Sequence, residues 1–312
     1  MFTPTRWVFS TLLLCAGWWG SAAAQARTTD QWLERPVDDA TFRTYLDFFV
    51  YDERLAFEIE TLGVEQIEGL EREHLSFIST PGERVTAHLY RPPGTSDGPT
   101  PGIVLLHGGS RNGKASRGTE LIAAVLARAG WTVLATDMQY YGERSTGLLQ
   151  TFTEQEKHEQ LYNQPSTYLA WITQDVKDAR RAIDFLVHER DVDPERIVLA
   201  GWSRGAQVAM IVGGAEQRFR AVVLLHGGHF DRLETGHLGA ACPANYIGRI
   251  SPRPLLMLNG KFDADYFRAT SVEPLQRLAG EPHLFQWAET GHGVLTDTDL
   301  ATLVEWLREA VP

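Results

Sequence analysis

The stretch that decides the fold is IVLAGWSRGA, residues 197–206. It joins an apolar, strand-like run to a helical pattern through the motif Gly-x-Ser-x-Gly, here Gly201 to Gly205. A motif of this kind between a strand and a helix is typical of a turn so tight that side chains on the two glycines would collide with the neighbouring backbone. The turn lifts the serine hydroxyl clear of the sheet. Ser203 is therefore the predicted nucleophile.

Short apolar runs alternate with helical stretches on both sides of this turn, after an initial hairpin. The alternation predicts an α/β protein whose mostly parallel, eight-stranded sheet is covered by helices on both faces. The predicted strands are 75–78, 84–90, 103–106, 131–135, 197–200, 221–225, 255–258 and 284–287, and the predicted helices are 119–129, 168–190 and 300–310.

The chain divides into a short extension and one large domain. Residues 27–72 carry apolar side chains three or four positions apart, such as Phe42 and Phe49, and we expect a helical extension packed on the main domain, its acidic residues facing solvent. Residues 73–312 form the predicted catalytic domain. Residues 142–167 fit neither a strand nor a helix and follow the fourth strand, where loops surround the ligand crevice of an open sheet. A cap over the site is expected there.

The N-terminal segment, residues 1–26, differs from the rest of the chain. Arg6 is its only charged residue, and an apolar run from Trp7 to Trp19 leads into small residues. A run of this length with an Ala-x-Ala end is typical of a signal peptide rather than a membrane span. We expect cleavage after Ala26, or after Ala24, and export to the periplasm or the medium. An uncleaved anchor is the alternative.

Composition narrows the possible partners. Removal of residues 1–26 moves the formal net charge from −11 to −12, so an affinity for nucleic acid or an anionic membrane through charge is not expected. The mature chain would keep Cys242 as its single cysteine, which rules out an internal disulfide. We expect Cys242 to be a small buried apolar residue.

A base and an acid are needed to activate the serine, and in a sheet of this kind they follow it in the order acid, histidine. His292 lies after the eighth strand between two glycines and is the predicted base. Asp263 follows the seventh strand and is the predicted acid. Asp265 is a close alternative, and Asp231, after the sixth strand, is a topological one.

Backbone donors for an oxyanion are expected from two places, the residue after the nucleophile and a glycine-rich loop after an earlier strand. Arg204 and the loop His107-Gly108-Gly109 occupy them. The predicted donors are the N–H groups of Gly109 and Arg204, while the ring of His107 is expected to hold the loop.

Three further histidines, His226, His229 and His237, follow the sixth strand. Their spacing matches no established ligand pattern and no carboxylate motif accompanies them, so we expect pocket lining and predict no metal and no cofactor. Trp202, Tyr141 and His229 are the candidate substrate-binding side chains.

The chain resembles the α/β-hydrolase superfamily, and within it the dienelactone hydrolase-like and prolyl-oligopeptidase-like esterases. The resemblance runs from about residue 73 to the end. It rests on His107-Gly108-Gly109, on residues 192–205, on Asn259-Gly260-x-x-Asp263 and on Gly291-His292-Gly293.

The resemblance implies hydrolysis of carboxylic esters, lactones or acylated sugars without a cofactor. Dienelactone hydrolases use cysteine where this chain has Ser203, so dienelactone chemistry is not expected, and the chain has no room for the extra domain of propeller-type oligopeptidases. The expected function is an exported serine hydrolase that cleaves a small-molecule ester through an acyl-enzyme. The alternatives are a peptidase or thioesterase on the same triad and a non-catalytic binding module.

Overall fold

A single sheet forms the centre of the computed structural model, which describes residues 30–94, 98–145, 151–230 and 236–312. The strands of this described part are β1 (Glu60–Ile67), β2 (Leu70–Thr80), β3 (Glu83–Arg91), β4 (Thr100–Leu106), β5 (Thr132–Thr136), β6 (Val192–Trp202), β7 (Ala221–Leu225), β8 (Leu255–Gly260) and β9 (His283–Ala288). Their order is β1-β2-β3-β5-β4-β6-β7-β8-β9. The pairs from β1 to β5 are antiparallel, and those from β5 to β9 are parallel.

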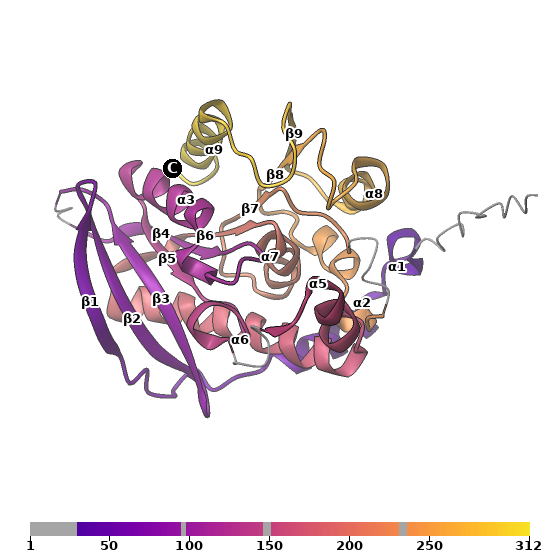
Figure 1. Cartoon of the computed structure of the whole chain (residues 1–312), viewed down its shortest axis with the longest axis horizontal. Coiled ribbons are helices and arrows are strands. Elements are labelled where there is room, and N and C mark those ends of the chain that lie inside the picture. The colour runs from indigo at the N-terminus through magenta and orange to yellow at the C-terminus, as the bar shows by residue number, and fades with distance from the viewer. Residues whose placement is uncertain (1–29, 95–97, 146–150, 231–235) are drawn as a thin grey trace, which may run out of the picture.

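Helices cover both faces of this sheet (Figure 1). The longer ones are α2 (Asp39–Leu46), α3 (Arg117–Arg128), α6 (Pro165–Glu189), α7 (Arg204–Ala215) and α9 (Asp297–Ala310). The short ones are α1 (Gln31–Glu34), η1 (Asp47–Phe49), η2 (Gly113–Ala115), η3 (Gly142–Arg144), α5 (Glu154–Lys157), η4 (His158–Tyr162), η5 (Gly239–Ala241), η6 (Pro243–Asn245), η7 (Ile247–Arg249), η8 (Arg268–Val272) and α8 (Glu273–Leu278). Side chains of α3 and α9 share one apolar core with the sheet, and those of α6 and α7 share the other.

Successive side chains of the central strands point to opposite faces of the sheet and contribute to the two cores in turn. In β4, Ile103 and Leu105 pack with α3 and α9, while Val104 and Leu106 pack with α6 and α7. Successive side chains of a strand point to opposite faces, so a strand buried on both sides is apolar at every position. This confirms the predicted mostly parallel sheet with helices on both faces, and each predicted strand overlaps an observed one.

One observed strand, β1, was not among the eight predicted. It corrects the prediction that residues 27–72 are helical. The helices α1, α2 and η1 lie in the first part of this segment, but residues 60–67 pair with β2 at the edge of the sheet. Glu65 stands opposite Arg72 in the ladder and accepts a hydrogen bond from its Nε at 3.0 Å. The acidic residues that suggested a solvated helix face therefore belong in part to an exposed edge strand, where charge discourages pairing with other chains.

Two sequence predictions lie outside the described residues: the signal peptide, residues 1–26, and the alternative acid Asp231. Cys242 is fully buried, as expected for a small apolar residue. Of the helices in the described ranges, none has the length and apolar character that crossing a bilayer requires.

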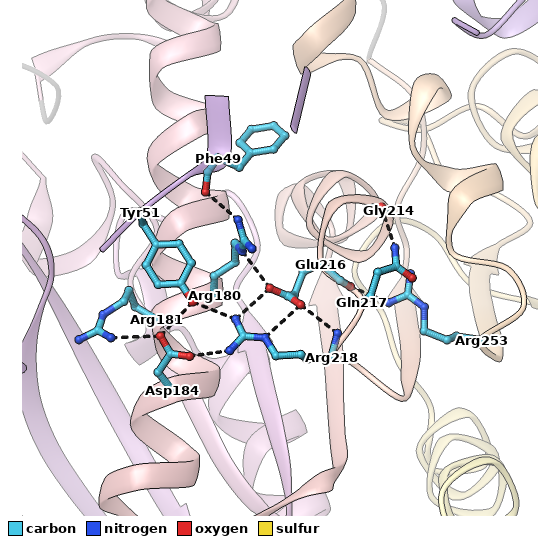
Figure 2. Close-up of polar contacts among 10 residues, drawn as sticks. All are labelled: Phe49, Tyr51, Arg180, Arg181, Asp184, Gly214, Glu216, Gln217, Arg218 and Arg253. Atoms are coloured by element: carbon cyan, nitrogen blue, oxygen red, sulfur yellow. Dashed lines mark hydrogen bonds and ion pairs between the residues drawn. The ribbon is translucent and has the colours of Figure 1, made fainter. Parts of the chain in front are cut away.

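An ion-pair network with buried carboxylates and partly exposed arginines joins α6 to the end of α7. Figure 2 shows Glu216 between two arginines, with its Oε2 2.8 Å from Arg180 Nε and 2.9 Å from Arg218 Nη2. Arg218 Nη1 also lies 2.6 Å from Asp184 Oδ1, and Tyr51 donates a hydrogen bond to Asp184 Oδ2. Burial acts to raise the pKa of Glu216, but the hydrogen bonds and charge of Arg218 and the charge of Arg180 lower it.

We predict that Glu216→Ala lowers the free energy of unfolding by about 2 kcal/mol, because Arg180 and Arg218, which are 23% and 39% exposed, lose the buried carboxylate that they share. The matched control is Glu195→Ala, since Glu195 is 76% exposed and lies 3.5 Å from Arg220; a change below about 1 kcal/mol is expected. Urea denaturation measures both. The lowered pKa of Glu216 means that its contribution is lost as the pH falls, so the gap between wild type and Glu216→Ala should narrow in acid. Equal effects of the two variants would contradict the prediction.

Candidate active site

The turn between β6 and α7 has the backbone that the Gly-x-Ser-x-Gly motif predicts. Ser203 has φ +54°, in the left-handed region that L-residues rarely adopt. A Cβ on Gly201 would lie 2.3 Å from the carbonyl oxygen of Gly205, and a Cβ on Gly205 would lie 2.2 Å from that of Leu106. Both positions accept only glycine. The Ser203 N–H donates to Leu225 O at 2.8 Å, which attaches the turn to the end of β7.

Three side chains distant in sequence meet at this turn. Ser203 Oγ lies 2.8 Å from His292 Nε2, and His292 Nδ1 lies 2.8 Å from Asp263 Oδ2. The loops that carry His292 and Asp263 follow the neighbouring strands β9 and β8. They are joined by the backbone hydrogen bond from Phe262 N to Thr290 O, 3.0 Å. The structure thus brings the predicted nucleophile, base and acid into one hydrogen-bonded chain.

The charges of the acid and the base depend on each other. Asp263 is 1% exposed, and burial acts to raise its pKa. The hydrogen bond from His292 and the N–H groups of Tyr266 and Asp265 outweigh burial and lower it. Burial also acts to lower the pKa of His292, but the hydrogen bond and charge of Asp263, with the charge of Asp265, raise it. With Asp263 ionised, the proton of neutral His292 lies on Nδ1, and the Nε2 lone pair faces Ser203.

The two alternative acids are placed differently. Asp265 is 64% exposed, and its Oδ2 lies 3.5 Å from His292 Nε2, the nitrogen on the serine side. It accordingly cannot hold the Nδ1 proton in this arrangement. Asp231 lies in the part of the chain that the structure leaves undescribed.

A second histidine supports this arrangement, and the sequence argument assigned it only to pocket lining. His226 follows β7 with φ +50°, is fully buried, and accepts a hydrogen bond on Nδ1 from Gly293 N at 3.2 Å. Its Nδ1 lies 3.9 Å from Asp263 Oδ2. Burial and the nearby His292 lower the pKa of His226 to about 4, so it is neutral near pH 7. The repeated Leu-His-Gly-Gly at 225–228 was the available sequence signal.

The loop after β4 lies directly against the nucleophile turn. A Cβ on Gly109 would be 3.8 Å from Arg204 Cβ, and one on Gly108 would be 3.4 Å from Ser203 Cβ. Arg204 begins α7, whose first-turn N–H groups have no acceptor within the helix. The two predicted donor residues are therefore neighbours beside Ser203.

The buried ring of His107 holds this loop, as the sequence suggested. Its Nε2 accepts a hydrogen bond from Met138 N at 3.0 Å, so the proton is on Nδ1 and is donated to Gly108 O at 2.6 Å. Burial lowers the pKa of His107, which keeps the ring neutral.

An open cleft of about 460 Å³ gives access to Ser203. Its lining consists of Gly108, Gly109, Ser110, Tyr141, His158, Tyr162, Trp202, Ser203, Arg204, Asp265, Tyr266, His292 and Gly293. Trp202 and Tyr141, predicted as substrate contacts, are among them. Trp202 also packs against the core. Its indole lies so close to Gly118 that a Cβ at that position would be 2.1 Å from it.

Sequence reasoning missed several of these lining residues. His158 and Tyr162 come from η4, inside the segment expected to form a cap, and Tyr162 Oη lies 3.0 Å from Tyr141 Oη. The guanidinium of Arg204 lies over the Tyr162 ring at 4.4 Å. No local sequence pattern indicates such contacts, because they depend on how the segment folds back.

His229 is not part of the cleft lining. Its Nε2 lies 2.8 Å from Asp30 Oδ2, and His237 Nε2 lies 2.7 Å from the same oxygen, with Cys242 Sγ 3.8 Å away. The prediction that His229 contacts the substrate is therefore wrong for this cleft, because its ring pairs instead with Asp30, 199 positions earlier in the chain. Within the part of the chain that the structure describes, two groups of side chains have the spacing to hold a metal ion: these four, and the His226–Asp263–His292 group described above.

A serine on a strand-to-helix turn, at the carboxyl ends of a mostly parallel sheet covered on both faces, defines the α/β-hydrolase fold. The chain belongs to the dienelactone hydrolase family, whose model matches residues 85–276.

The individual relatives share little sequence with this chain, or match only part of it. Uncharacterized protein YfhR of Escherichia coli K12 is 33% identical over 120 residues, 34% of this chain, and the chain covers 40% of that relative. Among solved structures, acetyl xylan esterase 1 from Thermoanaerobacterium sp. JW/SL YS485 is similar with a TM-score of 0.69 and 18% identity, covering 90% of this chain and 98% of its own. A putative dienelactone hydrolase from Klebsiella pneumoniae gives a TM-score of 0.57 and 16% identity, covering 80% and 99%. At these identities the structures show a shared fold.

Proposed function

We propose that the protein is an exported serine hydrolase that cleaves a carboxylic ester through a covalent acyl-enzyme. One observation carries the proposal: the chain of two 2.8 Å contacts from Ser203 Oγ through His292 to buried Asp263, at the wall of an open cleft. Membership of a hydrolase family supports it. Export is proposed from the signal-peptide pattern of residues 1–26.

The proposed reaction has two halves. In the first, His292 Nε2 takes the Ser203 proton while Oγ attacks the ester carbonyl, and the N–H groups of Gly109 and Arg204 face the resulting oxyanion. Collapse expels the alcohol, which receives the proton from His292, and leaves an ester on Ser203. In the second half, His292 takes a proton from water, hydroxide attacks the acyl carbon, and the proton returns to Ser203 as the acid leaves. Asp263 holds the Nδ1 proton and stabilises the imidazolium throughout.

The cleft favours a small substrate that contacts aromatic side chains. Its volume of about 460 Å³ is within the usual range for small-molecule sites, and Tyr141, Tyr162, Trp202 and Tyr266 supply aromatic surface. We also propose that residues 142–167 cap the site, since His158 and Tyr162 of this segment form part of the wall. Dienelactone chemistry is not proposed, because the nucleophile position holds Ser203.

The primary test is Ser203→Ala, which should lower ester turnover by about three orders of magnitude or more while the fold is kept, because a hydroxyl is lost but almost no volume. A fluorophosphonate probe should label the wild-type protein and fail to label this variant. Ser110→Ala, at a second serine of the cleft, is the control and should label normally. Wild-type protein without labelling or turnover on small esters would indicate a binding module instead.

The acid is tested by the pair Asp263→Asn and Asp265→Asn. The first should reduce kcat by about 10⁴-fold, because an amide cannot hold the His292 tautomer in which Nε2 is free to accept a proton. The second should have a far smaller effect, since Asp265 is exposed and faces the other nitrogen. Steady-state kinetics on a p-nitrophenyl ester measures both. The reverse order of effects would make Asp265 the acid.

The rate should rise with pH as a single ionisation, because only neutral His292 accepts the Ser203 proton. Asp263 and Asp265 raise the pKa of His292 against the effect of burial, while buried His226 is neutral and Tyr266 packs on the ring. The midpoint of kcat/KM should lie above about pH 6.5, the value of an unperturbed imidazole. Asp265→Asn should move it to lower pH. A profile that is flat from about pH 5 to 9 would exclude His292 as the base.

A further inference from the structure

A second cluster of reactive side chains lies outside the cleft, where the start of the described chain meets the connection between β7 and η5. Asp30, His229, His237 and Cys242 each offer one donor atom, and these atoms all lie within 4.8 Å of one another. None of the four lines the cleft that contains Ser203. The proposed reaction does not use them.

Hydrogen bonding accounts for only part of this arrangement. Asp30 Oδ1 accepts the N–H of Trp32, which directs Oδ2 toward the two imidazoles at 2.8 and 2.7 Å. The side chain of His237 is 8% exposed; its Nε2 lies 2.7 Å from Asp30 Oδ2, and its Nδ1 has no hydrogen-bond partner among the described residues. One carboxylate oxygen thus faces two imidazoles and a thiol, and this grouping of donor atoms is typical of a metal site.

We propose that Asp30, His229, His237 and Cys242 form a zinc site. Two imidazoles, one thiolate and one carboxylate are a donor set that suits Zn²⁺, because zinc accepts nitrogen, sulfur and oxygen ligands in tetrahedral geometry. Binding would release the Cys242 thiol proton, and the thiolate and carboxylate together would balance the two positive charges of the ion. Four protein ligands leave no open position, so the site is structural rather than catalytic.

The distances from Asp30 Oδ2 to the other three donor atoms require only a small adjustment. Zinc bonds of about 2.0 to 2.3 Å place tetrahedral ligand atoms roughly 3.3 to 3.8 Å apart. The Cys242 Sγ to Asp30 Oδ2 distance of 3.8 Å already fits this range. The two imidazole nitrogens, at 2.8 and 2.7 Å from the carboxylate oxygen, would move outward by about half an ångström to one ångström.

The position of the cluster explains what a bound ion would stabilise. It would join Asp30 to residues about 200 positions later in the chain, and so fix the N-terminal helices to the main domain. His229 is attached to η8 by a backbone hydrogen bond from its N–H to Ser271 O, 2.9 Å. A Cβ on neighbouring Gly228 would lie 2.8 Å from Tyr266, which lines the cleft. The ion would thus support one wall of the active site from behind.

The wild-type protein provides the first test. After removal of metal with a chelator, it should bind about one equivalent of Zn²⁺, measured by competition with a chromogenic chelator, and its melting temperature should rise. Co²⁺ in place of Zn²⁺ should give the intense visible bands of a tetrahedral site and a thiolate-to-cobalt charge-transfer band. Stoichiometric binding without that band would exclude Cys242, and failure to bind either ion would overturn the site.

Variants assign the ligands. His237→Ala and Cys242→Ser should weaken Zn²⁺ binding by about a hundredfold or more and abolish the zinc-dependent rise in melting temperature. His188→Ala, at an exposed histidine of α6, is the matched control and should bind Zn²⁺ as the wild type does. Ser203→Ala should also bind normally, which separates this proposal from the proposed catalysis. Equal binding by His237→Ala and the wild type would show that zinc is held elsewhere and overturn the assignment.

Discussion

The contact on which the site depends is the one between the nucleophile turn and the end of β4. A Cβ on Gly205 would lie 2.2 Å from Leu106 O, so the first turn of α7 rests on the strand backbone with no side chain between them. This close approach forces Ser203 into its left-handed conformation and places Gly109 beside Arg204. The positions of the oxyanion loop and of the serine are therefore set by the same backbone contact.

Sequence patterns were sufficient for the central sheet, because its strands are buried on both faces and their apolar runs are bounded by glycines and helical periods. They were also sufficient to predict that Ser203, Asp263 and His292 lie together, since parallel strands place the ends of β6, β8 and β9 at one edge of the sheet. The prediction of a helix at residues 60–67, which form the edge strand β1, was wrong for a physical reason. An exposed strand has no buried face, so its spacing of charged and apolar residues resembles that of a solvated helix.

Contacts between segments far apart in the chain could not be predicted from local sequence patterns. Asp30 meets His229 only because the N-terminal segment, through α1, packs against η6 and α8, and no local pattern records that packing. His226 was visible as part of a repeated motif, but its role beside Gly293 depends on how the loop after β9 turns back. Local patterns thus predicted the side chains that meet at the strand ends and missed those that contact them from other layers.

The ion pairs around Glu216 have a consequence for α7. This helix of 12 residues starts at the nucleophile turn and ends immediately before Glu216, about 18 Å away. Its start is held by the Gly205 contact and its end by Arg180 and Arg218. A helix held at both ends is restrained from sliding along its axis, so Ser203, just before its first residue, is held in position relative to β4. The position of the Ser203 hydroxyl is thereby linked to the ion pairs at the opposite end of α7.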